Sequence, residues 1–304
     1  SVGEKEAENN LRICFETALS EAKSASGVDH LTVQAAGLTL AGVDRPKDFA
    51  LVKKWMSEMP FYSPELKLTI HNDAIGALAS GTGGKLAGNC VIIAGTGAIA
   101  LGVKPDGKTV RTAGWGPLLN DGGSGYHIGQ LALTAAAKAA DGRGPPTALL
   151  EAILKHLQLA EPMDLIPWAY GTHGWAHIAS LCPTVIQCAE AADPVAEEII
   201  QLGVRELCGS VKALAAQMWP AEPPAAVGSH PAPASDGPSL TAPEFTLVLS
   251  GSLLEAGRHV GERLVKALRE DCPQAKPVHP QVEPAMGGAY IALQQLACGA
   301  PAAM

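Results

Sequence analysis

The sequence predicts an α/β fold, in which helices alternate with the strands of a mostly parallel sheet. Strand-like and helix-like segments alternate in the first part of the chain, in the order strand, helix, strand, helix, strand. Ala- and Leu-rich segments with helical spacing follow Tyr126, and an apolar strand pattern returns at residues 245–250. Because ligands bind at the carboxyl ends of strands in such folds, we expect the functional residues where strands end.

The first part of the chain shows the alternation most clearly. Residues 4–24 have helical spacing, with Leu11, Phe15 and Leu19 on one side. Pro46 stands where proline favours the start of a helix. The predicted elements are helices at 4–24, 46–59 and 74–80, strands at 30–40 and 66–73, an interrupted strand at 91–103, and a strand from the turn at 105–108 toward Trp115.

The rest of the chain is mostly helical until a short α/β pattern returns. Residues 219–243 are rich in Pro, Ala and Ser and cannot bury enough apolar surface to fold alone, which predicts a disordered insertion without a catalytic part. Residues 192–194 break the longest helical pattern. The predicted elements are helices at 130–140, 146–159 and 177–218, a strand at 245–250, and helices at 253–270 and 287–297.

Composition narrows the class of protein. A chain of 304 residues with 47% hydrophobic and 17% charged residues can bury the cores of two modest domains. The net charge of −8 disfavours a nucleic-acid partner, and no apolar run is long enough to span a membrane. The seven cysteines form no CxxC pair and most of them fall in apolar patterns, which predicts mostly buried, reduced thiols and a cytoplasmic location.

The stretch VIIAGTGAIALGV, residues 91–103, carries two glycines inside a strand pattern. Glycine weakens a strand and marks a bend or a close approach by another group. The turn at Gly95, Thr96 and Gly97 therefore has two interpretations. It binds phosphate through backbone amides and the hydroxyl of Thr96, or it is a simple hairpin corner.

Asp73 and Asp121 also allow both a functional and a purely structural interpretation. Asp73 ends a strand and can accept a proton from a hydroxyl group, although local sequence alone favours the cap of the next helix. A second glycine-rich loop contains Gly114, Trp115, Gly116 and Asp121. Asp121 can bind sugar hydroxyls or can simply form an Asp-Gly turn.

Two further dipeptides that contain glycine stand near predicted helix starts. Gly251 and Ser252 follow a strand, and Gly287 and Gly288 open the last helix. Each pair suits either a nucleotide site or an ordinary tight turn.

The order and spacing of these segments resemble one family over nearly the whole chain. The N-acetylglucosamine kinase group of the BadF/BadG/BcrA/BcrD ATPase family, within the sugar kinase/hsp70/actin superfamily, has similar segments. They are GLTLAGVD (37–44), HNDAIGA (71–77), IAGTGAIA (93–100), GWGPLLNDGGSGY (114–126), IASLC (178–182), LSGSLL (249–254) and AMGGAY (285–290).

The resemblance implies an ATP-dependent amino-sugar kinase with two actin-like, ribonuclease H-like domains around a cleft. Asp73 corresponds to the catalytic base that deprotonates the 6-hydroxyl of the sugar. ATP and Mg²⁺ are the implied cofactors, and no residue is assigned as a metal ligand. The implied nucleotide-binding residues are Gly95, Thr96, Gly97, Ala179, Gly251 and Gly287. The implied sugar-binding residues are Asp73, Ala98, Gly114, Trp115, Gly116 and Asp121.

The resemblance also predicts how the domains divide. We expect an incomplete first domain at 1–93, completed by the helix at 287–301, and a second domain at 94–286. The family's N-terminal glycine-rich hairpin has no counterpart, so we expect the first domain to be truncated. Four positions differ from the family's usual residues: Ala41, Ala98, Ile99 and Gly122.

Two other functions stay open from the sequence. One is a non-catalytic or truncated relative that binds sugar. The other is an iron–sulfur ATPase activator of a 2-hydroxyacyl-CoA dehydratase, for which Cys182 and Cys188 are the candidate ligands. The expected partners are an amino sugar and ATP, without nucleic acid or membrane, and a homodimer is compatible with this assignment.

Overall fold

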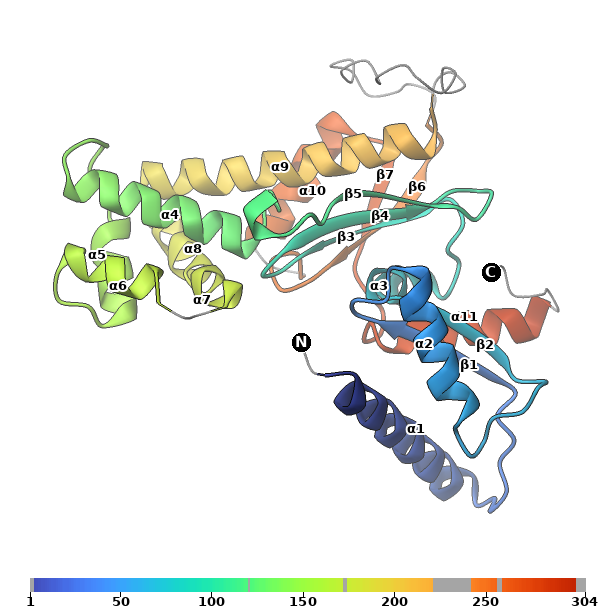
Figure 1. Ribbon diagram of the computed structural model, residues 1–304. Helices are drawn as coiled ribbons and strands as arrows, with labels where there is room; N and C mark the ends of the chain where they lie inside the picture. Colours follow the sequence, from blue (N-terminus) through green and yellow to red (C-terminus); the bar gives the residue numbers. More distant parts are fainter. Residues whose placement is uncertain (1–2, 120, 172–173, 221–241, 256–258, 299–304) are drawn as a thin grey trace. The chain divides into compact units, whose positions relative to one another are not determined.

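A computed structural model gives the fold of the chain (Figure 1). It describes all residues except 1–2, 120, 172–173, 221–241, 256–258 and 299–304. The predicted insertion at 219–243 therefore lies almost entirely outside the described residues. Contacts divide the chain into two compact units, residues 1–85 with 281–304 and residues 86–280. The predicted boundary after residue 93 differs, because it would cut a strand that pairs on both sides within the second unit.

The first unit is built on a pair of parallel strands. β1 and β2 pair in register from Ala35 with Lys67 to Leu40 with Asn72. Helix α11 packs on both strands and on α3, and α2 packs on β2. The elements are α1 (Glu4–Ser26), β1 (Ala35–Leu40), α2 (Pro46–Ser57), β2 (Lys67–Asn72), α3 (Asp73–Thr82) and α11 (Met286–Cys298). The predicted strand at 30–40 is thus shorter than expected, since it begins at Ala35.

The second unit contains a five-stranded sheet in the order β5-β4-β3-β6-β7. Strands β3, β4 and β5 are antiparallel neighbours, whereas β6 is parallel to β3 and β7 is parallel to β6. The strands are β3 (Asn89–Ala94), β4 (Ala98–Val103), β5 (Thr109–Ala113), β6 (Phe245–Ser250) and β7 (Ala275–Val278). β7 was not predicted from the sequence, because it is a short edge strand and contains Pro277, a residue type that is disfavoured in strands.

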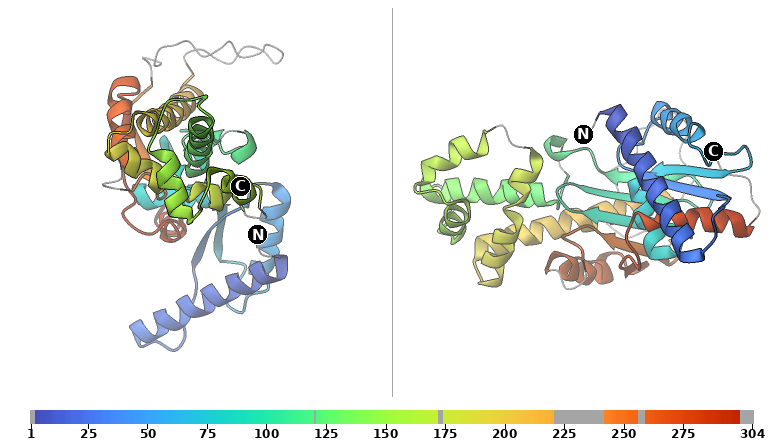
Figure 2. Two further views of the ribbon diagram at one scale, coloured as in Figure 1. Left: turned by 90° about the vertical axis from the view of Figure 1, so that its left-hand side faces the viewer. Right: turned by 90° about the horizontal axis from the view of Figure 1, so that it is seen from below.

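Helices cover this sheet and extend beyond it. The long helix α9 packs on β4, β5 and α10, and α4 to α8 form a helical group beside the sheet (Figures 1 and 2). The helices are η1 (Pro117–Leu119), α4 (Gly125–Ala140), α5 (Leu149–Leu157), η2 (Pro162–Asp164), α6 (Leu165–Ala169), α7 (Trp175–Ala179), α8 (Cys182–Glu190), α9 (Pro194–Met218) and α10 (His259–Asp271). No described helix combines the length and apolar character needed to cross a membrane.

The start of α9 agrees with the prediction from sequence, whereas the start of α10 does not. The predicted break at 192–194 is confirmed, because the Asp193 side chain caps α9 by accepting hydrogen bonds from the amides of Val195 and Ala196. The predicted helix at 253–270 begins later, at His259. Leu253 and Leu254 are buried in a turn before it, so their apolar character reflects packing rather than a helix face.

Glycines allow α11 to lie unusually close to its neighbours. A Cβ atom at Gly287 would lie 2.0 Å from the carbonyl oxygen of Gly76 in α3. A Cβ atom at Gly37 in β1 would lie 1.9 Å from the carbonyl oxygen of Gly288. Gly287 therefore has a packing role in the first unit. Its predicted contact with nucleotide stays a prediction.

Replacing Gly287 by Ala should destabilise the protein, because a backbone oxygen cannot move aside as a flexible side chain can. We expect a loss of roughly 1–3 kcal/mol or more, seen as a melting temperature lower by several degrees. Gly209→Ala is the matched control, since a Cβ atom there meets nothing within 4 Å and the site is inside helix α9. A melting temperature unchanged by Gly287→Ala would contradict the close packing.

Candidate functional site

The carboxyl ends of β3 and β6 bring two of the predicted glycine motifs together in the second unit. These strands are parallel neighbours, with Ile93 opposite Ser250. The Gly95–Gly97 turn follows β3, and the Gly251–Ser252 turn follows β6. The amide of Leu253 donates a hydrogen bond to the carbonyl oxygen of Ala94, at 3.1 Å. The two turns therefore form one structural group.

The Gly95–Gly97 turn combines both interpretations made from its sequence. It is a hairpin corner, since Ala94 pairs with Ala98 and the amide of Gly95 donates to the carbonyl oxygen of Gly97. Thr96 is exposed, and within the described chain the amides of Thr96 and Gly97 donate to no other residue. Open amides beside a hydroxyl group are suited to bind an anion such as phosphate.

The start of α4 fixes this turn in place. The amides of Gly125 and Tyr126 donate to the carbonyl oxygens of Gly95 and Thr96, at 2.7 and 3.2 Å. These amides are therefore occupied by the turn itself. A Cβ atom at Gly125 would lie 3.4 Å from the Cβ atom of Ala179, so the end of α7 reaches the same place.

Asp121 links the second glycine-rich loop to the turn. It is buried, with 5% of its surface exposed, and its Oδ1 accepts a hydrogen bond from the amide of Gly116 at 2.8 Å. Its Oδ2 lies 2.8 Å from the position that a Cβ atom of Gly97 would take. The carboxylate thus connects the loop after β5 with the loop after β3.

The rest of this loop is shaped by glycine and carries an exposed aromatic ring. Gly114 has a φ of +71°, and a Cβ atom there would lie 2.8 Å from Ile99 Cγ1 in β4. Trp115 is 67% exposed, and the Arg111 guanidinium lies 5.7 Å from its ring centre. An exposed indole beside a buried carboxylate can offer a stacking face and a hydrogen-bond acceptor to a polar ring.

Asp73 lies in the first unit, at the first position of α3. The cap of this helix is Asn72, whose side chain accepts from the amide of Ala74 at 2.8 Å, while Asp73 Oδ1 accepts from the same amide at 3.1 Å. The Asn72 side chain also donates to Asp44. Asp73 is exposed, so its carboxylate is available to a ligand without loss of the helix cap.

The structure therefore separates the predicted site residues into two sets. Asp73 and Gly287 belong to the first unit. The other predicted site residues lie at one end of the sheet in the second unit, where they contact one another or are adjacent in the chain. They are Gly95, Thr96, Gly97, Ala98, Gly114, Trp115, Gly116, Asp121, Ala179 and Gly251.

Sequence reasoning missed several residues that hold this end of the sheet. Ser124 caps α4 by accepting from the amide of His127, and His127 Nδ1 accepts from the amide of Gly123. Glu206 in α9 lies against Gly122. Ser124 carried a readable signal, since Ser before an apolar helix is a typical cap. The contact of Glu206 depends on the path of α9 and had no local signal.

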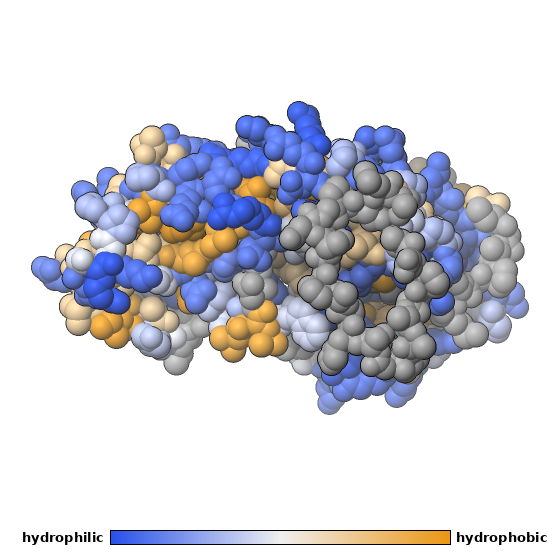
Figure 3. Space-filling model, turned by 90° about the horizontal axis from the view of Figure 1, so that it is seen from above, coloured by the Kyte–Doolittle hydropathy of each residue, from blue (hydrophilic) through white to orange (hydrophobic). Residues whose placement is uncertain are grey.

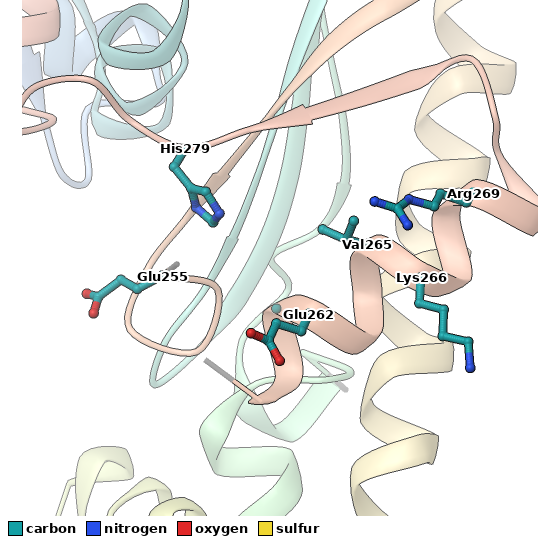
Figure 4. A pocket seen from close by; sticks show the side chains of 7 residues that line it. Glu255, Glu262, Val265, Lys266, Arg269 and His279 are labelled. Atoms are coloured by element: carbon teal, nitrogen blue, oxygen red, sulfur yellow. The ribbon is translucent and has the colours of Figure 1, made fainter. Parts of the chain in front are cut away.

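Two hollows in the described surface of the second unit lie away from the turns that carry the predicted residues, whereas a third, of about 520 Å³, lies beside the second glycine-rich loop and is lined by Ala113, Gly122 and Glu206 among others. Figure 4 shows a pocket of about 230 Å³ beside α10, where His279 and Glu255 approach from loops and Glu262, Val265 and Arg269 from the helix. Another hollow of about 520 Å³ lies on α5, and Figure 3 shows apolar surface over the helical part of this unit. Both combine apolar and charged side chains without a cluster of metal ligands.

Comparison with known proteins identifies the family. The profile of the BadF/BadG/BcrA/BcrD ATPase family matches residues 1–292. N-acetyl-D-glucosamine kinase from Dictyostelium discoideum is 37% identical over 266 residues, which is 86% of this chain and 76% of that protein. N-acetylmuramic acid/N-acetylglucosamine kinase from Clostridium acetobutylicum is 36% identical over 175 residues, or 57% of this chain and 56% of that protein.

Solved structures show the same fold. A proposed N-acetylglucosamine kinase from Chromobacterium violaceum superposes with a TM-score of 0.65 at 22% identity, covering 95% of this chain and 87% of that one. A proposed N-acetylglucosamine kinase from Porphyromonas gingivalis gives a TM-score of 0.64 at 17% identity, covering 98% and 88%. By the extent of its sequence match, the chain belongs to the BadF/BadG/BcrA/BcrD ATPase family.

Proposed function

We propose that this chain transfers the γ-phosphoryl group of ATP to the 6-hydroxyl of N-acetyl-D-glucosamine. The observation that carries the proposal is the meeting of a turn with open amides, Gly95–Gly97, with a loop anchored by the buried Asp121. Such a pairing suits a reaction that needs a phosphate and a hydroxylated substrate side by side. The 37% identity to an N-acetyl-D-glucosamine kinase supports the choice of sugar.

In this proposal the second unit positions the substrates. The open amides of Thr96 and Gly97 bind ATP phosphate oxygens, and Gly251 and Ala179 border the nucleotide. Asp121, Gly114, Trp115 and Gly116 bind the sugar, with Ala98 at the start of β4 nearby. Phosphoryl transfer depends mainly on positioning and on stabilising charge, which fits a site made of backbone amides and a few polar groups.

Asp73 has the role of general base. The sugar O6 attacks the γ-phosphorus, the bond from this phosphorus to the bridging oxygen breaks, and ADP leaves. The proton of the 6-hydroxyl passes to the Asp73 carboxylate. Asn72 supports this role because it caps α3 and leaves the exposed Asp73 carboxylate accessible.

Mg²⁺ fits the proposed site as an ion carried by ATP. The described residues contain no group of three or more His, Cys, Asp or Glu side chains arranged around a metal. Mg²⁺ in kinases needs few protein carboxylates, because phosphates and water supply most ligands. When bound, it neutralises the charge of the phosphates.

The iron–sulfur alternative has poorer support from the residues present. Cys182 and Cys188 are both buried in α8. Burial raises the pKa of Cys182 to about 12 and also raises the pKa of Cys188. Both side chains belong to the hydrophobic core of the second unit and not to its surface, which gives no support for a cluster held by these two cysteines.

A coupled assay of ADP release, with ATP and Mg²⁺, tests the proposal directly. The sugars are N-acetylglucosamine, N-acetylmannosamine, glucosamine and glucose, and the reaction without sugar gives the background. We expect N-acetylglucosamine to give the highest kcat/KM. ADP release that no sugar stimulates would contradict the kinase function and favour a non-catalytic sugar-binding relative.

A further inference from the structure

The loop that leads into α4 is held by a side chain that the proposed reaction does not use. His127 is in the first turn of α4. Its Nδ1 accepts a hydrogen bond from the amide of Gly123, and its own amide donates to Ser124 Oγ, both at 3.1 Å. One residue thus ties residues 123 and 124 to the helix through two separate bonds.

Helix α9 supports the other side of this loop. A Cβ atom at Gly122 would lie 2.6 Å from Glu206 Oε2, and one at Gly123 would lie 2.4 Å from Leu207 Cγ. The loop therefore passes α9 at contact distance. The Glu206 carboxylate occupies the space that a side chain at position 122 would need.

The fixed segment is continuous with Asp121. The amide of Ser124 donates to the carbonyl oxygen of Asp121 at 3.1 Å, and the Asp121 side chain holds the amide of Gly116. A shift of the backbone at residues 122–124 would therefore move the Asp121 carboxylate relative to the Gly95–Gly97 turn. Misplacement of a binding group by about 1 Å can reduce turnover by roughly a hundredfold.

We propose that His127 is a latch that, together with the contact of Glu206 against Gly122, fixes residues 122–124 and so positions Asp121 for the sugar. This inference rests on the function proposed above only for the identity of the ligand. His127 is a positioning residue, because its bonds go to the loop backbone.

The hydrogen bond from Gly123 determines the state of the imidazole that can hold the loop. Because an amide donates to Nδ1, the neutral ring carries its proton on Nε2. A protonated ring has no acceptor, so protonation breaks this bond. The latch therefore works only with neutral His127.

The surroundings keep His127 neutral. Burial lowers the pKa of His127 from its ordinary value of 6.5, and the Glu206 carboxylate on α9 opposes this shift. Helices α5, α7 and α8 also pack on α4, and none of their described ionisable groups shifts this pKa. Since the folded pKa lies below the unfolded one, the latch is complete above pH 6.5 and is lost as pH falls through the folded pKa.

A matched pair of substitutions tests the latch. His127→Asn places an amide oxygen near the position of Nδ1 and keeps an acceptor for Gly123, whereas His127→Leu has similar volume and no acceptor. Hydrogen exchange of the peptide at residues 121–128 reports on the loop without need for activity. We expect faster exchange, by about tenfold, in His127→Leu, and exchange near that of the unaltered protein in His127→Asn.

Kinetics test the consequence for the sugar. We expect His127→Leu to raise the KM for N-acetylglucosamine about tenfold while the KM for ATP changes by less than about twofold. In the unaltered protein the sugar KM should rise as the pH falls through the lowered pKa of His127, and His127→Asn should lose this rise. Glu206→Gln should move the rise to lower pH, because the carboxylate raises the pKa of His127.

The outcomes separate the latch from the proposed function. Equal hydrogen exchange in His127→Leu and His127→Asn, or equal loss of sugar affinity in both, would overturn the latch. If the unaltered chain phosphorylates no sugar, the proposed function fails, and the exchange of residues 121–128 still decides whether His127 holds the loop.

Discussion

Asp73→Asn should lower the kcat of sugar-dependent ADP release by roughly a hundredfold to ten-thousandfold, the range that general bases contribute. Asn has the size of Asp and can accept the hydrogen bond from the amide of Ala74, but it cannot take the proton of the 6-hydroxyl. The helix should remain intact, because Asn72 makes the shorter bond to the same amide, at 2.8 Å against 3.1 Å. The coupled assay measures kcat, and thermal melting checks the fold.

Glu65→Gln is the matched control for the loss of one negative charge. Glu65 is an exposed residue of the same unit, before β2, and has no assigned role in the reaction. Its substitution should leave kcat unchanged. If Asp73→Asn kept more than about a tenth of the kcat with an unchanged melting temperature, Asp73 would not be the base.

Much of the fold follows from local patterns in the sequence. Apolar periodicity located most of the helices and strands of both units, because side chains on one face of an element repeat at a fixed spacing, but it missed α6 and did not separate α7 from α8. The patterns failed where tertiary packing decides. Pro277 hid the edge strand β7, and the buried pair Leu253 and Leu254 imitated the start of a helix that begins at His259.

Some residues of the candidate site could be predicted from local sequence, whereas contacts that depend on tertiary packing could not. Gly95, Thr96 and Gly97 could be identified locally, since glycine inside a strand needs a special explanation. The sequence could not show that Asp121 packs against Gly97, because this contact requires the sheet and α4 to be in place. Local sequence favoured Asp73 as the cap of α3, and this prediction was wrong, because Asn72 holds the cap position and Asp73 is the first residue of the helix.

The glycine at position 287 has two possible explanations. A glycine pair at a helix start is compatible with nucleotide binding and with close helix packing. The contact with Gly76 explains the glycine without a ligand. Its role toward nucleotide can be tested only by a measurement that separates binding from stability.

Gly97→Ala should reduce kcat/KM by roughly tenfold to a hundredfold, since it disturbs the turn and the loop together. The added Cβ atom would lie 2.8 Å from Asp121 Oδ2. This carboxylate is buried and held by the amide of Gly116, so it cannot rotate away without losing that bond. We therefore expect higher KM values for both ATP and the sugar, measured in the coupled assay.

Gly95→Ala, in the same turn, distinguishes this steric mechanism from a general need for glycine. A Cβ atom at Gly95 would meet only Ser252 Oγ, at 3.8 Å, which is an ordinary contact. Its effect on the sugar KM should therefore be clearly smaller than that of Gly97→Ala. If both substitutions raised the sugar KM equally, flexibility of the turn would explain the loss. If Gly97→Ala raised only the KM for ATP, the Asp121 carboxylate would not couple the phosphate turn to the sugar loop.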